Sequence, residues 1–471
     1  MTNKIEKIAI APNNTYPIYM AVANQFEELI KNNEYIYNER LPALRLLAEH
    51  LGVALDTVKK AYSELESRQL VYSRVGSGTY VKWRQAGNAD ATLSETFIPP
   101  NSSTIDLSLN EQLLLNERGT ELGNAMARLA QQSARLNLMT SYQAPEHIIQ
   151  PQLDIIARFM NDAGIPATTG EMLLTSGAQQ GLHLVLQYLL NQNDVIVTGK
   201  LAYPGIKQAA SMLGRTLTTV AQDAEGLDIS DLETLLSKQT VNAVYITPEY
   251  DNPTTAVMSL TRRERLAKLA REHNFLIIED GALHMPPNGL PSLYSMVPEQ
   301  CIYLFSFSKI LAGGLRLGTL LASGRNYRRM AVAQQSQYWM VSPFLTSLAS
   351  DMILNGAAKR LLDKQTDELQ TRLQISKDIL QGYSISGSAP GYHLWLELPQ
   401  HISTDSFIST LKSHSVEVAP AKAFCMDNSP APQAVRISLA GSVSTENFIR
   451  GLEIIKECLE DSEQDGDWSI I

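Results

Sequence analysis

The chain has 471 residues, several times the length that one hydrophobic core needs, so we expect two or more domains. Its 44% hydrophobic and 19% charged content is that of a soluble globular protein, and no apolar run is long enough to predict a membrane span. The net charge of −10 is uneven: residues 1–84 carry 11 Lys and Arg against 9 Asp and Glu, so the acidic excess lies in the remainder and does not exclude nucleic acid as a partner of the first segment.

The first 82 residues combine three helical patterns with one hairpin pattern. Apolar residues recur at helical spacing from Tyr19 to Ile30, from Leu44 to Leu51 and from Val58 to Leu65. In the stretch LVYSRVGSGTYV that follows, apolar and polar residues alternate on both sides of a turn that contains two glycines. This order predicts a winged helix-turn-helix domain of the α+β type over residues 1–82.

The N-terminus, the cysteines, a linker and the C-terminal tail add to this domain organisation. The N-terminus lacks the apolar core of a signal peptide, and the three scattered cysteines predict neither a disulfide framework nor a metal pair, so we expect a cytoplasmic protein without a metal site. Residues 83–110 are rich in Ala, Asn, Ser, Thr and Pro and have no periodicity, which predicts a linker. Residues 461–471 form an acidic tail.

Residues 111–460 have the pattern of a larger α/β domain. Helical stretches separate five short runs that are apolar on both faces. These runs are residues 194–199, 243–248, 275–280, 302–308 and 318–323. Such runs predict a mostly parallel sheet that is covered by helices on both sides. From about residue 360 to 460, a long charged helix is followed by the strand-like YHLWLELP and AVRISLA, which predicts a small C-terminal α+β lobe.

The N-terminal segment resembles the GntR-type winged helix over about 65 residues. The resemblance rests on RLPALRLLAEHLGV, on the recognition-helix sequence DTVKKAYSELESRQLV and on the wing GSGTYV. It implies that a helix presents polar and basic residues to DNA bases and phosphates. The residues that it assigns to DNA binding are Arg45, Thr57, Lys59, Lys60 and Gly76. Many members of that family have Arg at the position of Leu55, and a module that only mediates protein contacts is the alternative.

Three polar residues of the larger domain follow predicted strands at their carboxyl ends. They are Asn252 after AVYITP, Asp280 at the end of FLIIED and Lys309 after IYLFSFS. Open α/β sheets bind ligands at this edge. Each residue also has a plain structural interpretation, because Lys309 can extend to solvent along apolar surface and Asp280 can cap a helix. Together, an amine, a carboxylate and an amide at one sheet edge favour a cofactor site.

Residues 110–460 resemble the class I/II aminotransferases, which have the α/β fold of type I transferases that depend on pyridoxal 5'-phosphate. The resemblance implies that Lys309 forms the internal aldimine, Asp280 pairs with the pyridine nitrogen and Asn252 donates to the ring oxygen. It places Tyr203 beside the cofactor ring and Arg436 at a substrate carboxylate. The residues that it assigns to the phosphate are Ser176, Gly177, Ala178, Gln179, Ser306, Ser308 and Arg316.

The sequence departs from the aminotransferase pattern near the cofactor ring. Many relatives have a Tyr two or three residues after the aspartate, where this chain has Ala282 and Leu283, and Thr255 stands where a glycine is usual. The upstream SYQAPEHIIQPQL also lacks the usual Gly and Leu-Arg of that entry loop. These changes are compatible with cofactor binding but argue against efficient transamination.

The two segments together resemble the MocR/GabR subfamily of GntR-type transcriptional regulators over the full chain. The resemblance implies a regulator that senses an amine or amino acid by aldimine exchange at Lys309, binds an operator in double-stranded DNA and forms a head-to-tail homodimer. The alternative is an active aminotransferase that carries an accessory DNA-binding domain. A regulator whose pocket has lost the cofactor is a third possibility. Whether the chain turns over substrate therefore stays open at this point.

Overall fold

The structure is a computed structural model that describes Ile8 and residues 17–32, 34–35, 39–68, 70–74, 78–81, 104–140, 146–284, 289–388, 390–441 and 443–467. The chain divides into two units, Met1–Asn101 and Ser102–Ile471, and each unit has its own hydrophobic core. Among the described residues, no helix is both long and apolar enough to cross a membrane.

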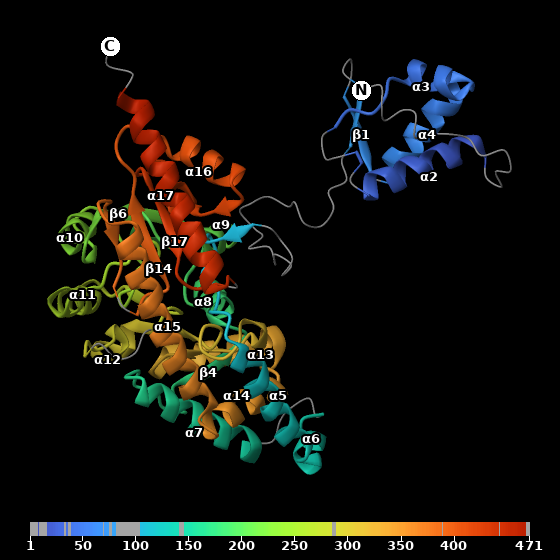
Figure 1. Ribbon diagram of the computed structural model, residues 1–471. Coiled ribbons are helices and arrows are strands. Elements are labelled where there is room, and N and C mark those ends of the chain that lie inside the picture. The colour runs from blue at the N-terminus through green and yellow to red at the C-terminus, as the bar shows by residue number, and fades with distance from the viewer. Residues whose placement is uncertain are drawn as a thin grey trace. The chain divides into compact units, whose positions relative to one another are not determined.

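The first unit is a small helical module with a two-stranded wing (Figure 1). Its elements are α2 (Ile18–Lys31), α3 (Leu44–Leu51), α4 (Leu55–Ser67), β1 (Val71–Arg74) and β2 (Gly78–Val81). Phe26, Leu47 and Val58 are fully buried between the helices. Gly52 ends α3 with a φ of 63°, a conformation that favours glycine. The predicted winged helix-turn-helix is confirmed, and its antiparallel strands pair Val71 with Val81.

The second unit is built on a seven-stranded sheet in the order β4-β12-β11-β10-β9-β5-β6. The strands are β4 (Met172–Thr175), β5 (Val195–Gly199), β6 (Thr216–Val220), β9 (Ala243–Ile246), β10 (Leu276–Gly281), β11 (Cys301–Ser306) and β12 (Gly318–Leu321). All neighbours are parallel except β12, which runs antiparallel to β11 and β4. The mostly parallel sheet predicted from the apolar runs is therefore confirmed, whereas β4 and β6 were not predicted.

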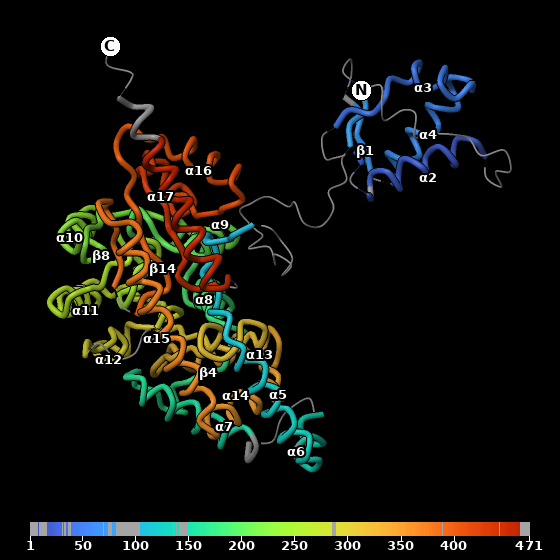
Figure 2. Tube along the Cα trace, viewed as in Figure 1, coloured from blue at the N-terminus to red at the C-terminus, as the bar shows by residue number. Residues whose placement is uncertain are grey.

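Helices cover both faces of this sheet, so that β10 is buried on each side. One face packs on α8 (Ala178–Tyr188), α9 (Pro204–Met212) and α13 (Gly324–Tyr338). The other packs on α7 (Glu146–Asp162), α10 (Ile229–Leu236), α11 (Leu260–His273), α12 (Leu293–Met296) and α14 (Pro343–Leu354). Figure 2 shows α14 running beside α7 and α5 (Asn116–Ala130), and the short α6 (Ser133–Leu138) follows α5. Because side chains alternate along a strand, Ile278 and Asp280 lie on the face opposite to Ile277 and Glu279.

The predicted small lobe has a second sheet in the order β13-β14-β17-β16. Its elements are α15 (Ala357–Ile379), β13 (Ile385–Ser386), β14 (His393–Glu397), α16 (Thr404–Ser413), β15 (Val416–Glu417), β16 (Ala419–Pro420), β17 (Ala434–Ser438) and α17 (Thr445–Asp467). The helix α17 continues to Asp467, although the sequence assigned the tail from residue 461 onward.

The last part of the predicted linker belongs to the second unit. Ile105–Asp106 form β3, which pairs in parallel with β15 and lies beside α17 (Figure 1, cyan and red). The amides of Ile105 and Leu107 donate to the carbonyls of Ser415 and Glu417, each over 2.8 Å. The boundary predicted at residue 110 is thus too late, because residues 104–110 are hydrogen-bonded into the small lobe. The preceding residues, 82–103, lie outside the described residues.

Candidate functional site

A buried carboxylate lies at the carboxyl end of β10. Asp280 accepts a 2.6 Å hydrogen bond from the hydroxyl of Tyr245 on β9 and a 2.9 Å bond from the backbone N–H of Ala282. Burial raises the pKa of Asp280 above its ordinary value, and both donors oppose that rise by stabilising the charged form. A cationic ring nitrogen beside the two carboxylate oxygens would also stabilise the charged form. Asp280 is therefore suited to pair with a protonated heterocycle.

Lys309 follows β11 in a tight turn that is held from outside. Its side-chain nitrogen donates to the backbone carbonyl of Asn110. The next two carbonyls, of Ile310 and Leu311, accept from the buried guanidinium of Arg118 on α5, with 2.7 Å to Ile310. Arg118 therefore fixes the backbone that presents Lys309, and the lysine itself is half-buried.

An anion-binding geometry is present at the N-terminus of α8. Gly177 is the N-cap with a φ of 88°, and a Cβ atom there would lie 2.8 Å from Nη2 of Arg316. Nη1 of Arg316 donates to the hydroxyl of Ser308 over 3.4 Å, and the N–H of Ser308 donates to the hydroxyl of Ser306 over 3.2 Å. Free N–H groups and a guanidinium at a helix start favour a phosphate dianion. These residues fit the phosphate of a cofactor, because only glycine leaves the room at position 177.

Two further predicted residues lie together beside this helix start. A Cβ atom on Gly205 would collide with the ring of Tyr203 and lie 2.5 Å from Oε1 of Gln179. The Gln179 amide donates to the carbonyl of Gly205 over 3.3 Å, while its buried Oε1 has no hydrogen-bond partner in this structure. Ser176 and Ala178 flank Gly177, so the predicted phosphate and ring residues from β4, α8 and α9 converge.

Arg436, on β17, joins the small lobe to the loop after β9. Its Nη1 donates to Oδ1 of Asn252 over 2.8 Å, its Nη2 donates to the carbonyl of Ser108 over 2.5 Å, and its guanidinium lies 4.8 Å from the centroid of the Phe424 ring. The guanidinium is buried at 5% exposure. Since two of its donors meet neutral oxygens, a carboxylate that reached Nη1 and Nη2 would replace weaker partners by a charged one.

The loop that carries Asn252 is organised by its neighbour Asp251. The Asp251 carboxylate accepts 2.6 Å bonds from the hydroxyls of Thr247 and Thr254. Thr255 closes the loop with a φ of 66°, in the left-handed region that a β-branched residue rarely adopts. This explains why a glycine is usual at position 255, and it places local backbone strain three residues from Asn252.

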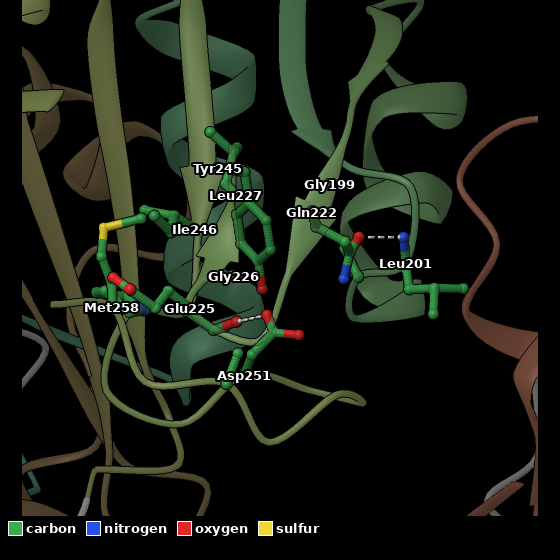
Figure 3. Close-up of a pocket in the computed structure, with 14 residues that line it drawn as sticks. Gly199, Leu201, Gln222, Glu225, Gly226, Leu227, Tyr245, Ile246, Asp251 and Met258 are labelled. Atoms are coloured by element: carbon green, nitrogen blue, oxygen red, sulfur yellow. Dashed lines mark hydrogen bonds between the residues drawn. The ribbon is translucent and has the colours of Figure 1, made fainter. Parts of the chain in front are cut away.

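A small pocket opens beside these residues (Figure 3). It is lined by Tyr245, Asp251 and the hairpin of β7 (Gln222–Asp223) and β8 (Gly226–Leu227), and the Gln222 side chain accepts a 2.7 Å bond from the N–H of Leu201. The pocket shares Tyr245 with the Asp280 site. Lys309, Arg316 and Arg436 do not line this pocket, so it borders the predicted site residues from the side of β5 and the β7–β8 hairpin and is not their centre.

The structure describes four of the five residues predicted to bind DNA. Arg45 on α3 and Lys59 and Lys60 on α4 are exposed, and Thr57 is half-buried in the first turn of α4. Lys59 forms an exposed 3.3 Å ion pair with Asp56. The fifth residue, Gly76, lies outside the described residues. The three cations are therefore accessible to phosphates, and surface pairing of Lys59 is a weak competitor.

Comparison with known families assigns both units. Residues 102–455 match the family "Aminotransferase class I and II", and residues 18–81 match "Bacterial regulatory proteins, gntR family". The chain belongs to the class I and II aminotransferase family. Its N-terminal unit is a GntR-type DNA-binding domain, and the two in this order give the chain the MocR-like architecture.

This member of the aminotransferase family is similar to two kinds of protein, transcriptional regulators and aminotransferases. It is 28% identical over 450 residues to YdeF of Bacillus subtilis, described as an uncharacterized HTH-type transcriptional regulator, with 94% of this chain and 95% of the relative covered. It is 26% identical to the 2-aminoadipate transaminase of Thermus thermophilus, over 62% of this chain and 75% of that enzyme. The kynurenine aminotransferase of Pyrococcus horikoshii has a TM-score of 0.68 at 22% identity and covers 77% of this chain and 92% of its own, which shows the type I transferase fold.

Several residues of the site were not predicted from the sequence. Tyr245 and Asn110 contact the predicted residues Asp280 and Lys309, whereas Arg118 and His393 contact Ile310 and Asp251, which are the neighbours of Lys309 and Asn252 in the chain. Tyr245 lies inside a buried strand and Asn110 ends the predicted linker, so neither has a local pattern that marks it. Many aminotransferase relatives have a tyrosine where this chain has Ala282 and Leu283, whose side chains have no hydroxyl. The N–H of Ala282 donates to Asp280 instead.

Glu279, which precedes Asp280 in β10, is a fully buried carboxyl that makes the stability of the fold depend on pH. It accepts bonds from the N–H groups of Leu293 and Tyr294 at 3.1 and 2.9 Å, yet burial, with the nearby Glu249, raises its pKa to about 7. The folded chain then keeps a proton that the unfolded chain releases above its ordinary pKa of 4.5, so unfolding free energy falls as pH rises from about 4.5 to 7.

Replacing Glu279 by glutamine is expected to remove this slope. Relative to the natural chain, the variant gains roughly 3 kcal/mol between pH 4.5 and 7, at 1.4 kcal/mol per pH unit. Urea unfolding of the full chain across this pH range measures the difference. Glu397→Gln changes an exposed carboxyl on β14 and serves as the control. Parallel pH profiles for all three proteins would mean that Glu279 is ionised throughout.

Proposed function

We propose that this chain is a transcriptional regulator that binds pyridoxal 5'-phosphate and senses an amino acid or other amine. The observation that carries the proposal is the presence in one chain of a GntR-type domain and a site with an amine, a buried carboxylate, a guanidinium at the start of α8 and the buried Arg436, with Ala282 and Leu283 where many relatives have a tyrosine. A DNA-binding regulator acts where the DNA is, so we also propose a cytoplasmic location and, from the resemblance, a head-to-tail homodimer.

Each predicted residue has a defined part in this proposal. Gly177, Ser308 and Arg316 hold the cofactor phosphate, with Ser176, Ala178, Gln179 and Ser306 around them. Asp280 holds the protonated ring nitrogen, Asn252 faces the ring oxygen and Tyr203 lies beside the ring. The cofactor, when bound, supplies an aldehyde carbon that reacts reversibly with primary amines, and Lys309 is the resident amine. Arg436 selects ligands that carry a carboxylate, because two of its donors can bind both carboxylate oxygens.

The test combines absorption and DNA binding in the full-length protein. Pyridoxal phosphate should give a visible band, and one or more of the twenty common L-amino acids should shift it, whereas ethylamine, which lacks a carboxylate, should act only at much higher concentration. The same amino acid should change affinity for a duplex selected from random DNA by about fivefold or more. A shifted band with unchanged DNA affinity would contradict the sensing function.

Active transamination is the second candidate, and a specific observation favours it. Lys309, Asp280 and Arg436 are all retained, and the chain is related to 2-aminoadipate transaminase of Thermus thermophilus. Turnover with an amino-acid panel and 2-oxoglutarate separates the two. Sustained conversion at about 1 per second or faster would support the enzyme, whereas a single partial turnover would support the sensor.

A further inference from the structure

One short segment contacts both the cation that the proposed function assigns to the cofactor and the cation that it assigns to the ligand carboxylate. Ser108 offers its carbonyl to Nη2 of Arg436 at 2.5 Å, and two residues later Asn110 offers its carbonyl to the side-chain nitrogen of Lys309. A ligand carboxylate at Arg436, or any group that engages the Lys309 nitrogen, competes with these carbonyls for the same hydrogens. Residues 108–110 therefore lie where a ligand carboxylate at Arg436 and a change in the bonding of Lys309 would both be felt.

The side chain of Asn110 is tied to a buried histidine. Its Nδ2 lies 2.8 Å from Nδ1 of His393, and Nε2 of His393 lies 3.2 Å from the carbonyl of Asp251. A carbonyl only accepts, so Nε2 carries the hydrogen and Nδ1 accepts from Asn110. The ring is fully buried, and its burial, together with the charge of Arg436, lowers its pKa well below the ordinary value, which keeps it neutral.

Two observations link this contact to the site. Asn110 is 8% exposed, and its Oδ1 has no hydrogen-bond partner in the structure, so the pair is not a closed structural network. The Asp251 carbonyl that His393 fixes belongs to the residue before Asn252, which itself accepts from Arg436. The pair thus joins the turn of Lys309 to the loop of Asn252 and Arg436.

The same segment continues toward the DNA-binding unit. Leu107 is held on both sides, because its N–H donates to Glu417 and its carbonyl accepts from Ser438 over 2.7 Å. Ile105 pairs with β15, and the chain before it, residues 82–103, leads to the GntR-type domain. Residues 108–110 are therefore separated from that connection only by residues 104–107, which are hydrogen-bonded to the small lobe.

We infer that Asn110 and His393 are positioning residues for ligand sensing, which hold residues 108–110 against Lys309 and Arg436 so that ligand binding displaces this segment and alters the connection to the DNA-binding unit. The inference rests on the proposed function for its ligand. It adds the residues that transmit occupancy of the site. They form a two-state element that the ligand biases through its carboxylate at Arg436 and through the change that it causes in the bonding of Lys309.

Hydrogen exchange in the full-length protein tests the positioning role without any ligand. In Asn110→Leu and His393→Leu, the amides of residues 104–110 should exchange about fivefold faster than in the natural chain. His393→Gln keeps one acceptor and one donor and should restore slow exchange. Asn447→Leu, an exposed change on α17, is the control. Natural exchange rates in both leucine variants would overturn the inference.

The coupling is tested with the L-amino acid that shifts the visible band most. In Asn110→Leu, the midpoint of the absorption titration should stay within about threefold of the natural value, while the effect of that amino acid on DNA affinity falls to less than half. A merely structural role would not separate these two measurements. Unchanged coupling in Asn110→Leu would overturn the inference. An absent band or absent coupling in the natural chain would instead overturn the proposed function. In that case, the hydrogen-exchange result decides the positioning role of Asn110 and His393.

Discussion

Alanine in place of Lys309 is expected to abolish the visible band and to make operator affinity independent of any amino acid. The lysine is the only proposed group that offers a primary amine to the cofactor aldehyde, and alanine also removes the hydrogen bond to the carbonyl of Asn110. Affinity for the selected duplex should stay within about twofold of one of the two natural states, because the change leaves Arg45, Lys59 and Lys60 in place. The loss should therefore be in regulation and not in DNA binding.

Absorption spectra and DNA titrations with and without the effective amino acid measure both parts. Lys207→Ala is the matched control. Lys207 is an exposed lysine on α9, four residues after Tyr203, and its side-chain nitrogen donates to the carbonyl of Cys425 over 2.8 Å. It should keep the band and the response. A Lys309→Ala protein that still changed its DNA affinity with the same amino acid would contradict sensing through this lysine.

The sequence was informative where local pattern and position in the sheet coincide. Apolar runs predicted β5, β9, β10, β11 and β12. The polar residues at or shortly beyond the ends of β9, β10 and β11 follow three strands that are adjacent in the sheet. That pattern works because a parallel sheet with helices on both faces forces its strands to be apolar throughout. Asp280 and Lys309 are then visible as exceptions to the pattern.

Contacts made by backbone carbonyls could not be predicted in the same way. Ser108 and Asn110 act through their C=O groups, which every residue has, and the stretch around them has the composition of a linker. Their place is fixed by β15, some 300 residues later in the chain, through a pairing of two residues only. Such a short parallel pairing has no local signature, so the boundary at residue 110 was placed too late.

Arg263 is an intermediate case, because the pattern of α11 marks this residue as unusual but does not indicate its partners. In α11, residues 263, 266, 267 and 270 lie at helical spacing on the buried face, and Arg263 is the one charged member. A charged residue on an apolar stripe needs buried partners. Here the guanidinium donates to the carbonyls of Pro248, Met258 and Pro291 at 2.8 to 3.0 Å. It thereby clamps both ends of the loop that presents Asn252.

Replacing Arg263 by methionine is expected to lower the unfolding free energy of the second unit by about 3 to 5 kcal/mol, since it strips the donors from three carbonyls in a buried site. The same change should weaken pyridoxal phosphate binding, because the loop of Asn252 loses its clamp. Urea unfolding and cofactor titration of the full chain measure the two effects.

The neighbouring residue supplies a matched control for this prediction. Arg262 is 21% exposed and pairs with Asp223 at 2.6 Å on the solvent side of the same helix turn. Arg262→Met removes an equal charge and an equal side chain, yet a surface ion pair contributes only about 1 kcal/mol or less. Equal losses of stability in the two variants would show that charge or helix propensity, and not the three buried carbonyls, explains the effect. A loss confined to Arg263→Met would identify the clamp as a structural requirement for presenting Asn252 to the cofactor.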